Sequence, residues 1–405
     1  MIQTDVLVIG SGGAGCSAAL EALKVCQSVH IITKGDFLNS KTSNAQGGIQ
    51  AAMGVDDSPT LHQEDTLRAG EYQNNIKLVE ILTTQAQPTI KWLESLGVIF
   101  DRVGSDYLLQ KAAGLSQARI LSCGDKSGNR LMGPMKQAIQ ESNVQVLEYA
   151  YPKEFIVDEV GFKVLIGSRF NNDQVITAKS IVLACGGYVA PEKRTGIEIK
   201  NNIEIPDIYD LIKDIGINVV YPDLVQYHPT GIVNPKQLRR ERIPETVRSA
   251  GATLLNKNLE EFCDSLATRN KLTKIIIEEC KKGNGISTDD GRVGVWLNTP
   301  IVEKNHGTGY YQERFPSLNK KFLDLNIDIS KEMVLVFPIL HYSLGGIEIN
   351  EKTETNVKGI FAAGEATYGV HGKDRLMGNS LLDIFVFGRL AGKSAAMNTK
   401  GNQNN

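Results

Sequence analysis

A glycine-rich segment near the N-terminus restricts the fold of this chain more than any other feature. The apolar run VLVI within Asp5–Ile9 leads into GSGGAG, and the small residues of Ala14–Lys24 follow. An unbroken apolar run is typical of a parallel strand buried on both faces, and small residues let a helix lie close to a sheet. Val29–Thr33 is a second apolar run. This order predicts a Rossmann-like α/β domain.

The glycines of this loop predict a dinucleotide site. Gly10 permits the tight turn, Gly12 lets the backbone approach a pyrophosphate, and Gly15 lets the helix and the strand pack closely. Free N–H groups at the start of the helix would then face the phosphates. We assign cofactor contacts to the whole loop, which consists of Gly10, Ser11, Gly12, Gly13, Ala14 and Gly15.

The end of the second strand does not identify the dinucleotide. An acid at this point usually binds the ribose, but here the strand ends in Thr33 and Lys34. Thr33 could replace the acid, or Lys34 could bind a phosphate. The glycine motif alone therefore leaves NAD, NADP and FAD as alternatives.

The rest of the chain continues the α/β pattern and changes character in its second half. From about Thr230 to Leu340 it is richer in charge and in loop glycines. We therefore predict an α+β domain of residues 231–340, inserted between the segments 1–230 and 341–405 of the first domain, with a ligand cleft between the domains. Other predicted elements are helices at Leu78–Leu96, Leu272–Lys281 and Ser380–Ala396, strands at Ser180–Ala184 and Gly359–Ala363, and a hairpin of Lys163–Gly167 with Gln174–Thr177.

Composition excludes several classes of function. The 405 residues have a net charge of −2, which gives no broad field to attract nucleic acid or an acidic membrane. No segment has the apolar length of a membrane span, and Met1 leads almost directly into the first strand, without a signal peptide. The six cysteines lie far apart with no CxxC pair, which argues against iron–sulfur, zinc or disulfide sites. We expect a cytoplasmic protein without a metal, in which an anionic ligand needs a local basic pocket.

Six further motifs follow one another along most of the chain. They are SNAQGGIQAA (43–52), HQEDTLRAGE (62–71), QYHPTGI (226–232), ETVRSAGATLLN (245–256), HYSLGGIEI (341–349) and AAGEATYGVHGKDRLMGNSLLD (362–383). In these motifs the chain resembles the flavoprotein of the succinate dehydrogenase, fumarate reductase and L-aspartate oxidase family, without that family's C-terminal helical domain. The resemblance implies FAD as cofactor, a capping domain inserted into the FAD domain, and a catalytic cleft where the two meet.

The resemblance also implies which residues contact FAD. Glu365 would hold a ribityl or ribose hydroxyl, and Asp207 keeps the acid of the family's GDG motif. Asn379, Ser380 and Leu381, at the start of the last predicted helix, would present N–H groups to the pyrimidine edge of the flavin. The residues that would line the isoalloxazine and the pyrophosphate are Ser43, Asn44, Gln46, Gly47 and Gly48.

The resemblance places the substrate between two histidines and an arginine. His228, His341 and Arg375 match the family's substrate-binding positions. Two imidazoles and a guanidinium can clamp two carboxylates, the guanidinium with two parallel hydrogen bonds. Alternatively, each histidine could be a structural residue beside a turn, with its own hydrogen bonds satisfied within the fold.

Proton transfer is implied for three more residues. Arg269 matches the arginine that acts as acid or base in the family, and Glu245 and Arg248 match its proton relay. Free arginine is a very weak acid, so a second cation and a carboxylate would have to make transient deprotonation tolerable. The alternative is a salt-bridge cluster at a domain interface.

Several positions depart from the family pattern. Lys41 stands where quinone-linked members attach FAD through a histidine, which predicts non-covalent FAD. Ala112 stands where aspartate oxidases have a glutamate for the substrate amine. Pro244 replaces a substrate-binding threonine, Asn270 replaces an aspartate, and Ile208 replaces the last glycine of GDG.

Three hypotheses follow. The first is a fumarate reductase or succinate dehydrogenase type of oxidoreductase that acts on a small dicarboxylate. The second is an L-aspartate oxidase-like enzyme or another unsaturated-acid reductase. The third is a flavin-binding partner or sensor protein whose catalysis has decayed. Because the sequence contains no motif for a second redox group, we expect a separate electron carrier, either an iron–sulfur subunit or a soluble reductant.

Overall fold

The glycine loop lies between the first strand and the first helix, as the sequence predicts. The computed structural model describes residues 2–37, 39–158, 161–188, 207–239 and 241–401. The strand β1 (Ile2–Ile9) leads into the loop, the helix α1 (Gly13–Leu23) leaves it, and β2 (Val29–Thr33) pairs with β1 in parallel. This is the Rossmann-like arrangement.

A seven-stranded sheet forms the centre of the larger body. Its order is β8-β2-β1-β11-β10-β9, and β19 also pairs with β11. The strands from β8 to β11 and β19 are parallel, whereas β10 and β9 are antiparallel. The further bounds are β8 (Gln145–Glu148), β9 (Ala150–Asp158), β10 (Gly161–Ser168), β11 (Gln174–Leu183) and β19 (Ile360–Ala362).

One long strand replaces two expected ones. The sequence predicts a hairpin strand at Gln174–Thr177 and a separate parallel strand at Ser180–Ala184, but β11 runs through both without a break. Its first half pairs with β10 in a hairpin, its last three residues pair with β19, and β1 pairs along nearly its whole length. Lys179 is the polar residue that hides this continuity in the sequence, and it sits in mid-strand.

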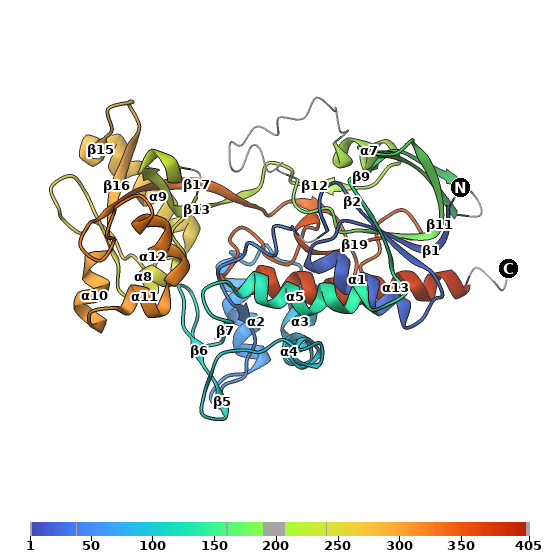
Figure 1. Cartoon of the computed structure of the whole chain (residues 1–405), viewed down its shortest axis with the longest axis horizontal. Helices are drawn as coiled ribbons and strands as arrows, with labels where there is room; N and C mark the ends of the chain where they lie inside the picture. Colours follow the sequence, from blue (N-terminus) through green and yellow to red (C-terminus); the bar gives the residue numbers. More distant parts are fainter. Residues whose placement is uncertain (1, 38, 159–160, 189–206, 240, 402–405) are drawn as a thin grey trace.

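Two helices pack tightly against each other through small residues beside this sheet (Figure 1). They are α1 and the C-terminal helix α13 (Asn379–Gly401). A Cβ at Gly388 would lie 2.5 Å from the Ala14 oxygen, and one at Gly392 would lie 2.0 Å from the Ala18 oxygen. The glycines of α13 therefore let the two backbones touch, and this contact fixes the start of α13 near the glycine loop.

The helix expected at Leu78–Leu96 is two helices. They are α3 (Ile76–Thr84) and α4 (Ala86–Ser95), which meet at Gln85. Pro88 has no N–H, and its ring would clash with the carbonyl four residues earlier in a continuous helix, so it is tolerated only in the first turn of a new one.

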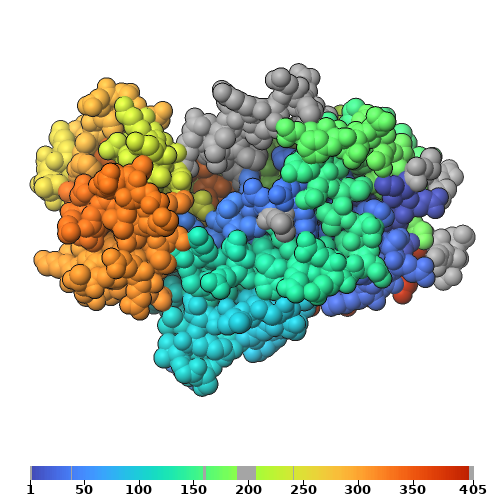
Figure 2. Space-filling model, in the orientation of Figure 1, coloured from blue at the N-terminus to red at the C-terminus, as the bar shows by residue number. Residues whose placement is uncertain are grey.

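A second lobe is built around its own sheet at one end of the molecule (yellow to orange in Figures 1 and 2). We call it the capping region. Its sheet has the order β13-β17-β16-β14 and buries a separate hydrophobic core against five helices. The strands are β13 (Val225–Asn234), β14 (Thr253–Leu255), β15 (Ile286–Ser287), β16 (Val293–Asn298) and β17 (Val334–Ser343), and the helices are α8 (Glu245–Ser249), α9 (Arg269–Glu279), α10 (Pro300–His306), α11 (Tyr310–Arg314) and α12 (Pro316–Leu323).

The remaining elements are short or lie on the surface of the larger body. They are α2 (Pro59–Ala69), α5 (Ser127–Gln140), α7 (Ile208–Asp214), β3 (Ile49–Gln50), β4 (Arg102–Val103), β5 (Asp106–Tyr107), β6 (Leu109–Gln110), β7 (Ile120–Leu121), β12 (Val219–Val220), β18 (Gly346–Ile347), η1 (Lys236–Leu238), η2 (Cys280–Asn284) and η3 (Gly364–Ala366). Among the described residues, none of these or the other helices combines the length and apolarity of a membrane span. The expected class, a Rossmann-like α/β body with an α+β capping region, is confirmed.

Candidate flavin and substrate site

The glycine loop is shaped to admit a phosphate at the start of α1. A Cβ at Gly10 would lie 2.2 Å from the Ala184 oxygen, and one at Gly15 would lie 1.8 Å from the Gly10 oxygen, so both glycines serve the packing of the chain itself. A Cβ at Gly12 would meet only the Thr42 hydroxyl, at 3.4 Å, within the described part of the chain. The space before Gly12 is therefore open to a ligand, and the loop fits a cofactor pyrophosphate.

The end of β2 is tied to this loop. The Ser11 hydroxyl donates to the Thr33 hydroxyl at 2.9 Å, and both side chains are buried. The Gly13 N–H donates to the hydroxyl of Thr42 at 3.1 Å, which joins the loop to the 41–48 segment. Lys34 is exposed. Thr33, and not Lys34, is thus the residue through which β2 supports the loop.

A cavity of about 340 Å³ lies between the larger body and the capping region. Its lining from the larger body includes the expected cofactor residues Asn44, Gln46, Gly47, Gly48, Glu365, Ser380 and Leu381, as well as Lys41. Its lining from β13, β17, α8, α9 and the 375 loop includes His228, His341, Glu245, Arg269 and Arg375. Segments more than 300 residues apart in the chain thus meet around one space.

The glycine loop, Thr33 and Lys34 do not line this cavity, and neither do four other expected residues. The Ser43 hydroxyl lies 2.9 Å from that of Ser40. Asp207 caps α7 and accepts from the Tyr209 N–H at 2.9 Å. Arg248 and Asn379 are buried behind the lining. Arg248 and Asn379 therefore act on the cavity only through neighbours, and the contacts of Asp207 and Ser43 with a cofactor stay predictions.

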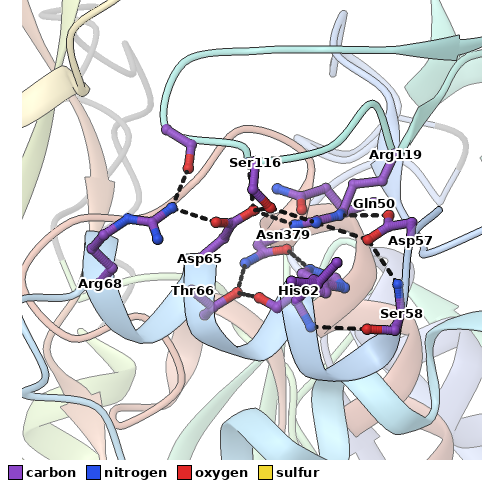
Figure 3. A network of polar contacts seen from close by, with 12 residues as sticks. Gln50, Asp57, Ser58, His62, Asp65, Thr66, Arg68, Ser116, Arg119 and Asn379 are labelled. Atoms are coloured by element: carbon purple, nitrogen blue, oxygen red, sulfur yellow. Dashed lines mark hydrogen bonds and ion pairs between the residues drawn. The ribbon is translucent and has the colours of Figure 1, made fainter.

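Asn379 is held in place by two residues of α2 (Figure 3). His62 Nε2 lies 2.8 Å from Asn379 Oδ1, and Asn379 Nδ2 donates to the Thr66 hydroxyl at 3.0 Å. Burial lowers the pKa of His62 to about 4, so the ring is neutral and donates from Nε2. The Asn379 N–H bonds the Leu376 oxygen at 3.3 Å. This clamp positions the start of α13, where Ser380 and Leu381 face the cavity.

A buried ion-pair network extends from this clamp, and the sequence analysis did not predict it. Arg119 is fully buried between Asp57, at 2.9 Å, and Asp65, at 2.6 Å (Figure 3). Asp65 also accepts from the N–H and the hydroxyl of Ser116, each at 2.7 Å. The network fixes the 111–116 segment against α2. The HQEDTLRAGE motif contains Asp65 but does not show its partner.

Glu245 lies between two arginines beside the cavity. Its Oε2 is 2.8 Å from Arg269 Nε and 3.5 Å from Arg248 Nη2, and all three side chains are buried. Burial raises the pKa of Glu245, but Arg269 and Arg248 outweigh it and hold that pKa below the usual value of 4.5. The carboxylate is therefore ionised. It accepts a hydrogen bond from Arg269 and forms an ion pair with Arg248, whose Nη2 has no hydrogen-bond partner among the described residues.

Arg269 is fixed from a second side by a glutamine. Its Nη1 donates to Gln226 Oε1 at 3.1 Å, and Gln226 Nε2 donates to the Arg375 carbonyl at 2.8 Å and to the Asp374 carboxylate. Asp374 also accepts from the Asn270 N–H at the start of α9, at 3.0 Å. Gln226 and Asp374 lie inside quoted motifs, but only the fold brings them together between the two guanidinium groups.

The two histidines are neutral hydrogen-bonding groups. The rings of His228 and His341 are 5.3 Å apart and nearly perpendicular. Burial, followed by the nearby arginines, lowers both pKa values well below 6.5. His228 Nδ1 lies 3.2 Å from the Thr230 hydroxyl, which leaves Nε2 for a ligand. Each ring can therefore offer hydrogen bonds without adding a positive charge.

Arg375 presents a buried guanidinium group to the cavity. Its guanidinium lies 4.5 Å from the centre of the Tyr342 ring, and Nη1 donates to the Leu376 oxygen at 3.1 Å. Burial and then Arg269 lower its pKa to about 10. Its Nε is buried with no hydrogen-bond partner among the described residues. An anion in the cavity would relieve both costs.

The sequence analysis missed one further cation at the cavity. Arg242 lines it beside Pro244, and burial and then Arg269 lower the pKa of Arg242 to about 10. Around the two neutral imidazoles the lining therefore brings together the guanidinium groups of Arg242, Arg269 and Arg375 with the carboxylate of Glu245. This set suits a small dianion next to a planar cofactor.

Comparisons with known proteins agree with this geometry. A family model described as FAD binding domain matches residues 5–381. The chain is 34% identical to one subunit of the fumarate reductase (CoM/CoB) from Methanothermobacter marburgensis, covering 98% of this chain and 73% of that protein. It is 34% identical to L-aspartate oxidase from Clostridium perfringens, covering 95% of this chain and 85% of that protein.

A solved structure agrees as well. The FrdA chain of E. coli quinol fumarate reductase superposes with a TM-score of 0.89 at 27% identity, covering 100% of this chain and 72% of that chain. The cofactor expected from the motifs, FAD, is supported by the family and by the shape of the loop. The chain therefore belongs to the FAD-dependent oxidoreductases of the fumarate reductase, succinate dehydrogenase and L-aspartate oxidase family.

Proposed function

We propose that this protein interconverts a C4 dicarboxylate pair such as fumarate and succinate. The observation that supports this most is the position of Arg269: it lines the cavity, is buried, and lies 2.8 Å from a carboxylate that is itself paired with a second arginine. A proton donor is needed at this point, because reducing a carbon–carbon double bond adds a hydride to one carbon and a proton to the other.

The residues of the chain divide this work. FAD, when bound, supplies or accepts the hydride at its N5. Arg375, with hydrogen bonds from His228 and His341, holds the substrate carboxylates and withdraws charge from the double bond. Ser380 and Leu381 lie at the start of α13, whose positive end stabilises negative charge at the edge of the flavin. The capping region contributes one side of the chamber.

Proton transfer runs through Arg269, Glu245 and Arg248. Arg269 gives its proton to the substrate carbon and regains one from Glu245, which exchanges protons with Arg248. Glu245 is placed to return a proton to Arg269 at once, because its Oε2 lies 2.8 Å from Arg269 Nε. In succinate oxidation the same residues work in reverse.

The L-aspartate oxidase alternative is less well supported. Ala112 stands at the position where aspartate oxidases have a glutamate for the substrate amine. It packs in a small apolar cluster with Leu376 and Met377. A methyl group at that point cannot pair with an ammonium group. The relatives named above include enzymes of both kinds, so the substrate must be measured directly.

The reaction needs an electron carrier. One relative is named as one of the subunits of a fumarate reductase, which supports a partner protein for this chain as well. We infer that an iron–sulfur subunit, or else a soluble reductant, exchanges electrons with the flavin. Purification of the native protein, followed by iron analysis of whatever copurifies, distinguishes the two.

The test of the proposed function is direct. Protein reduced with dithionite without air is mixed with fumarate, and the absorbance of oxidised flavin is expected to return as succinate forms. Arg269→Ala should slow this return at least about 100-fold while FAD stays bound. Arg292→Ala, a change of an exposed arginine, is the control. Reoxidation of the flavin by other unsaturated acids, or only by oxygen, would support the alternative. No reoxidation, with FAD bound, would support a decayed enzyme.

A further inference from the structure

Arg242 reaches the cavity because of its place in a short strand-like segment. The Ile243 N–H donates to the Thr230 oxygen and the Ile232 N–H donates to the Glu241 oxygen, both at 2.9 Å, so residues 241–243 pair with β13. Side chains alternate across such a segment. Ile243 is fully buried in the core of the capping region, so Arg242 points the other way, into the cavity that it lines.

In the described part of the chain, acidic residues offset the charge of this guanidinium only in part. Within the described ranges no ion pair joins Arg242 to an acid, and the neighbouring Glu241 pairs instead with Lys321. Burial and Arg269 lower the pKa of Arg242, whereas Glu241 raises it, and Arg242 in turn lowers the pKa values of His228 and His341. A partly buried cation beside another cation is costly unless an anion joins them.

The residue at position 244 leaves the cavity without a hydrogen-bond donor that Arg242 can replace. Pro244 also lines the cavity, two residues after Arg242, and a proline ring offers no hydrogen-bond donor. The family resemblance places a threonine at this position, whose hydroxyl would bind a substrate carboxylate. Arg242, from the same segment, offers a stronger and charged donor to the same chamber.

We propose that Arg242 binds one carboxylate of the substrate and makes the site selective for dianions over monoanions. This inference rests on the proposed function only for the location of the substrate, and it concerns a residue outside the motifs shared with the family. Arg375 and Arg242 then provide one guanidinium for each of two carboxylates, while Glu245 is already neutralised by Arg269 and Arg248. Guanidinium pairs with carboxylate through two parallel hydrogen bonds, so the selectivity depends on shape as well as on charge.

The test measures anion binding to the oxidised, FAD-loaded protein. Malonate serves as an unreactive dianion and propionate as a monoanion of similar size, and both are titrated by the change in flavin absorbance and by calorimetry. Arg242→Leu should weaken malonate binding about 10- to 100-fold and change propionate binding less than about threefold. Arg242→Lys should recover part of the affinity, and Arg292→Leu should change neither.

A second variant tests the relation to position 244. Adding Pro244→Thr to Arg242→Leu should restore part of the malonate affinity, because the hydroxyl replaces the lost donor. In turnover with fumarate, Arg242→Leu should raise KM much more than it lowers kcat, since Arg242 binds the substrate without transferring a proton. FAD content and far-UV circular dichroism establish that each variant is folded, and Arg242→Gln replaces any leucine variant that is not.

Two results would overturn the inference. One is equal weakening of malonate and propionate, which would indicate a structural role. The other is unchanged malonate affinity in both Arg242→Leu and Arg242→Gln. If wild-type protein binds malonate through Arg242 but fumarate does not reoxidise its flavin, the inference holds and the proposed function fails. If Arg269 is essential for fumarate reduction but Arg242 variants bind malonate as tightly as wild type, the proposed function holds and the inference fails.

Discussion

Glu245 Oε2 lies 2.8 Å from Arg269 Nε and 3.5 Å from Arg248 Nη2, so one carboxylate joins two arginines. Only Arg269 and Glu245 of the three line the cavity, and Arg248 is buried behind them. The order from the cavity inward is therefore arginine, carboxylate, arginine. In the proposed mechanism, a proton that Arg269 gives to a substrate would be replaced along this order.

Glu245→Gln should slow reoxidation of reduced flavin by fumarate by about 10²- to 10⁴-fold, because the amide cannot pass a proton between the two arginines. FAD binding should be retained, since Glu245 belongs to the capping region. Stopped-flow absorbance measures the rate. Glu278→Gln, a change at an exposed position of α9, is the control. A rate within threefold of wild type would contradict the relay.

Two glycine variants of one loop should differ sharply in their effect on the stability of the apoprotein. In Gly15→Ala the new methyl would lie 1.8 Å from the Gly10 oxygen, so the apoprotein should be strongly destabilised. In Gly12→Ala the nearest described atom is 3.4 Å away, so the apoprotein should unfold at nearly the wild-type temperature. Its FAD affinity should still fall, because the methyl takes the place of a phosphate.

The measurements are thermal unfolding of both apoproteins and titration with FAD. Equal FAD affinity in Gly12→Ala and wild type would show that the pyrophosphate does not approach this glycine. A stable, FAD-binding Gly15→Ala variant would contradict the tight contact between the strand and the helix.

FAD should be released when the protein is precipitated with acid. Lys41 lies in the cavity lining where a histidine makes the covalent bond in quinone-linked relatives, and a lysine does not form that bond. All yellow colour should therefore appear in the supernatant, where its absorbance matches free FAD. Colour that stays in a washed pellet would show a covalent link.

Stability should fall on mild acidification because three histidines are buried in neutral form. The pKa values of His62, His228 and His341 are lowered by burial, that of His62 to about 4, against 6.5 when exposed. Below pH 6.5 these histidines are protonated in the unfolded chain but remain neutral in the folded chain. The free energy of unfolding therefore decreases as the pH falls from 6.5 toward 4. Each histidine contributes up to about 1.4 kcal/mol per pH unit in this window.

Urea unfolding of the apoprotein at pH 7.5, 6 and 5 measures this dependence. His62→Gln keeps a hydrogen-bond donor for Asn379 but cannot be protonated. The pH dependence of the free energy of unfolding should therefore lose the contribution of about one proton. An unchanged slope in that variant, or wild-type stability that rises toward pH 5, would contradict the assignment of a neutral, buried His62.

Much of the fold could be predicted from short-range sequence patterns. The glycine loop and its flanking elements are local, and the loop is confirmed in place. Of the two wrong predictions, one arose from a neighbour in space and the other from a local proline. Pairing with β1 keeps β11 continuous through Lys179, and Pro88 divides one expected helix because the chain can turn at Gln85.

The site was predictable only in part. Motifs identified Arg269, Glu245 and the histidines, and the fold brings them to one cavity, although their roles stay proposals. Arg242 belongs to no motif, and its direction depends on pairing with β13, which the sequence does not show. Asp57, Asp65 and Arg119 are likewise ordinary charged residues in the sequence and become a buried network only once α2 and β7 are folded together.

In the described part of the chain, the backbone crosses between the two hydrophobic cores along β13 and β17, and these strands contain His228 and His341. The register between them shifts from His228 to Gly231, where a Cβ would meet the Ile339 side chain at 2.6 Å. The two strands that connect the lobes therefore also set the spacing of the His228 and His341 rings. A substitution that disturbs this register would therefore alter the spacing of the two imidazoles together with the connection between the two cores.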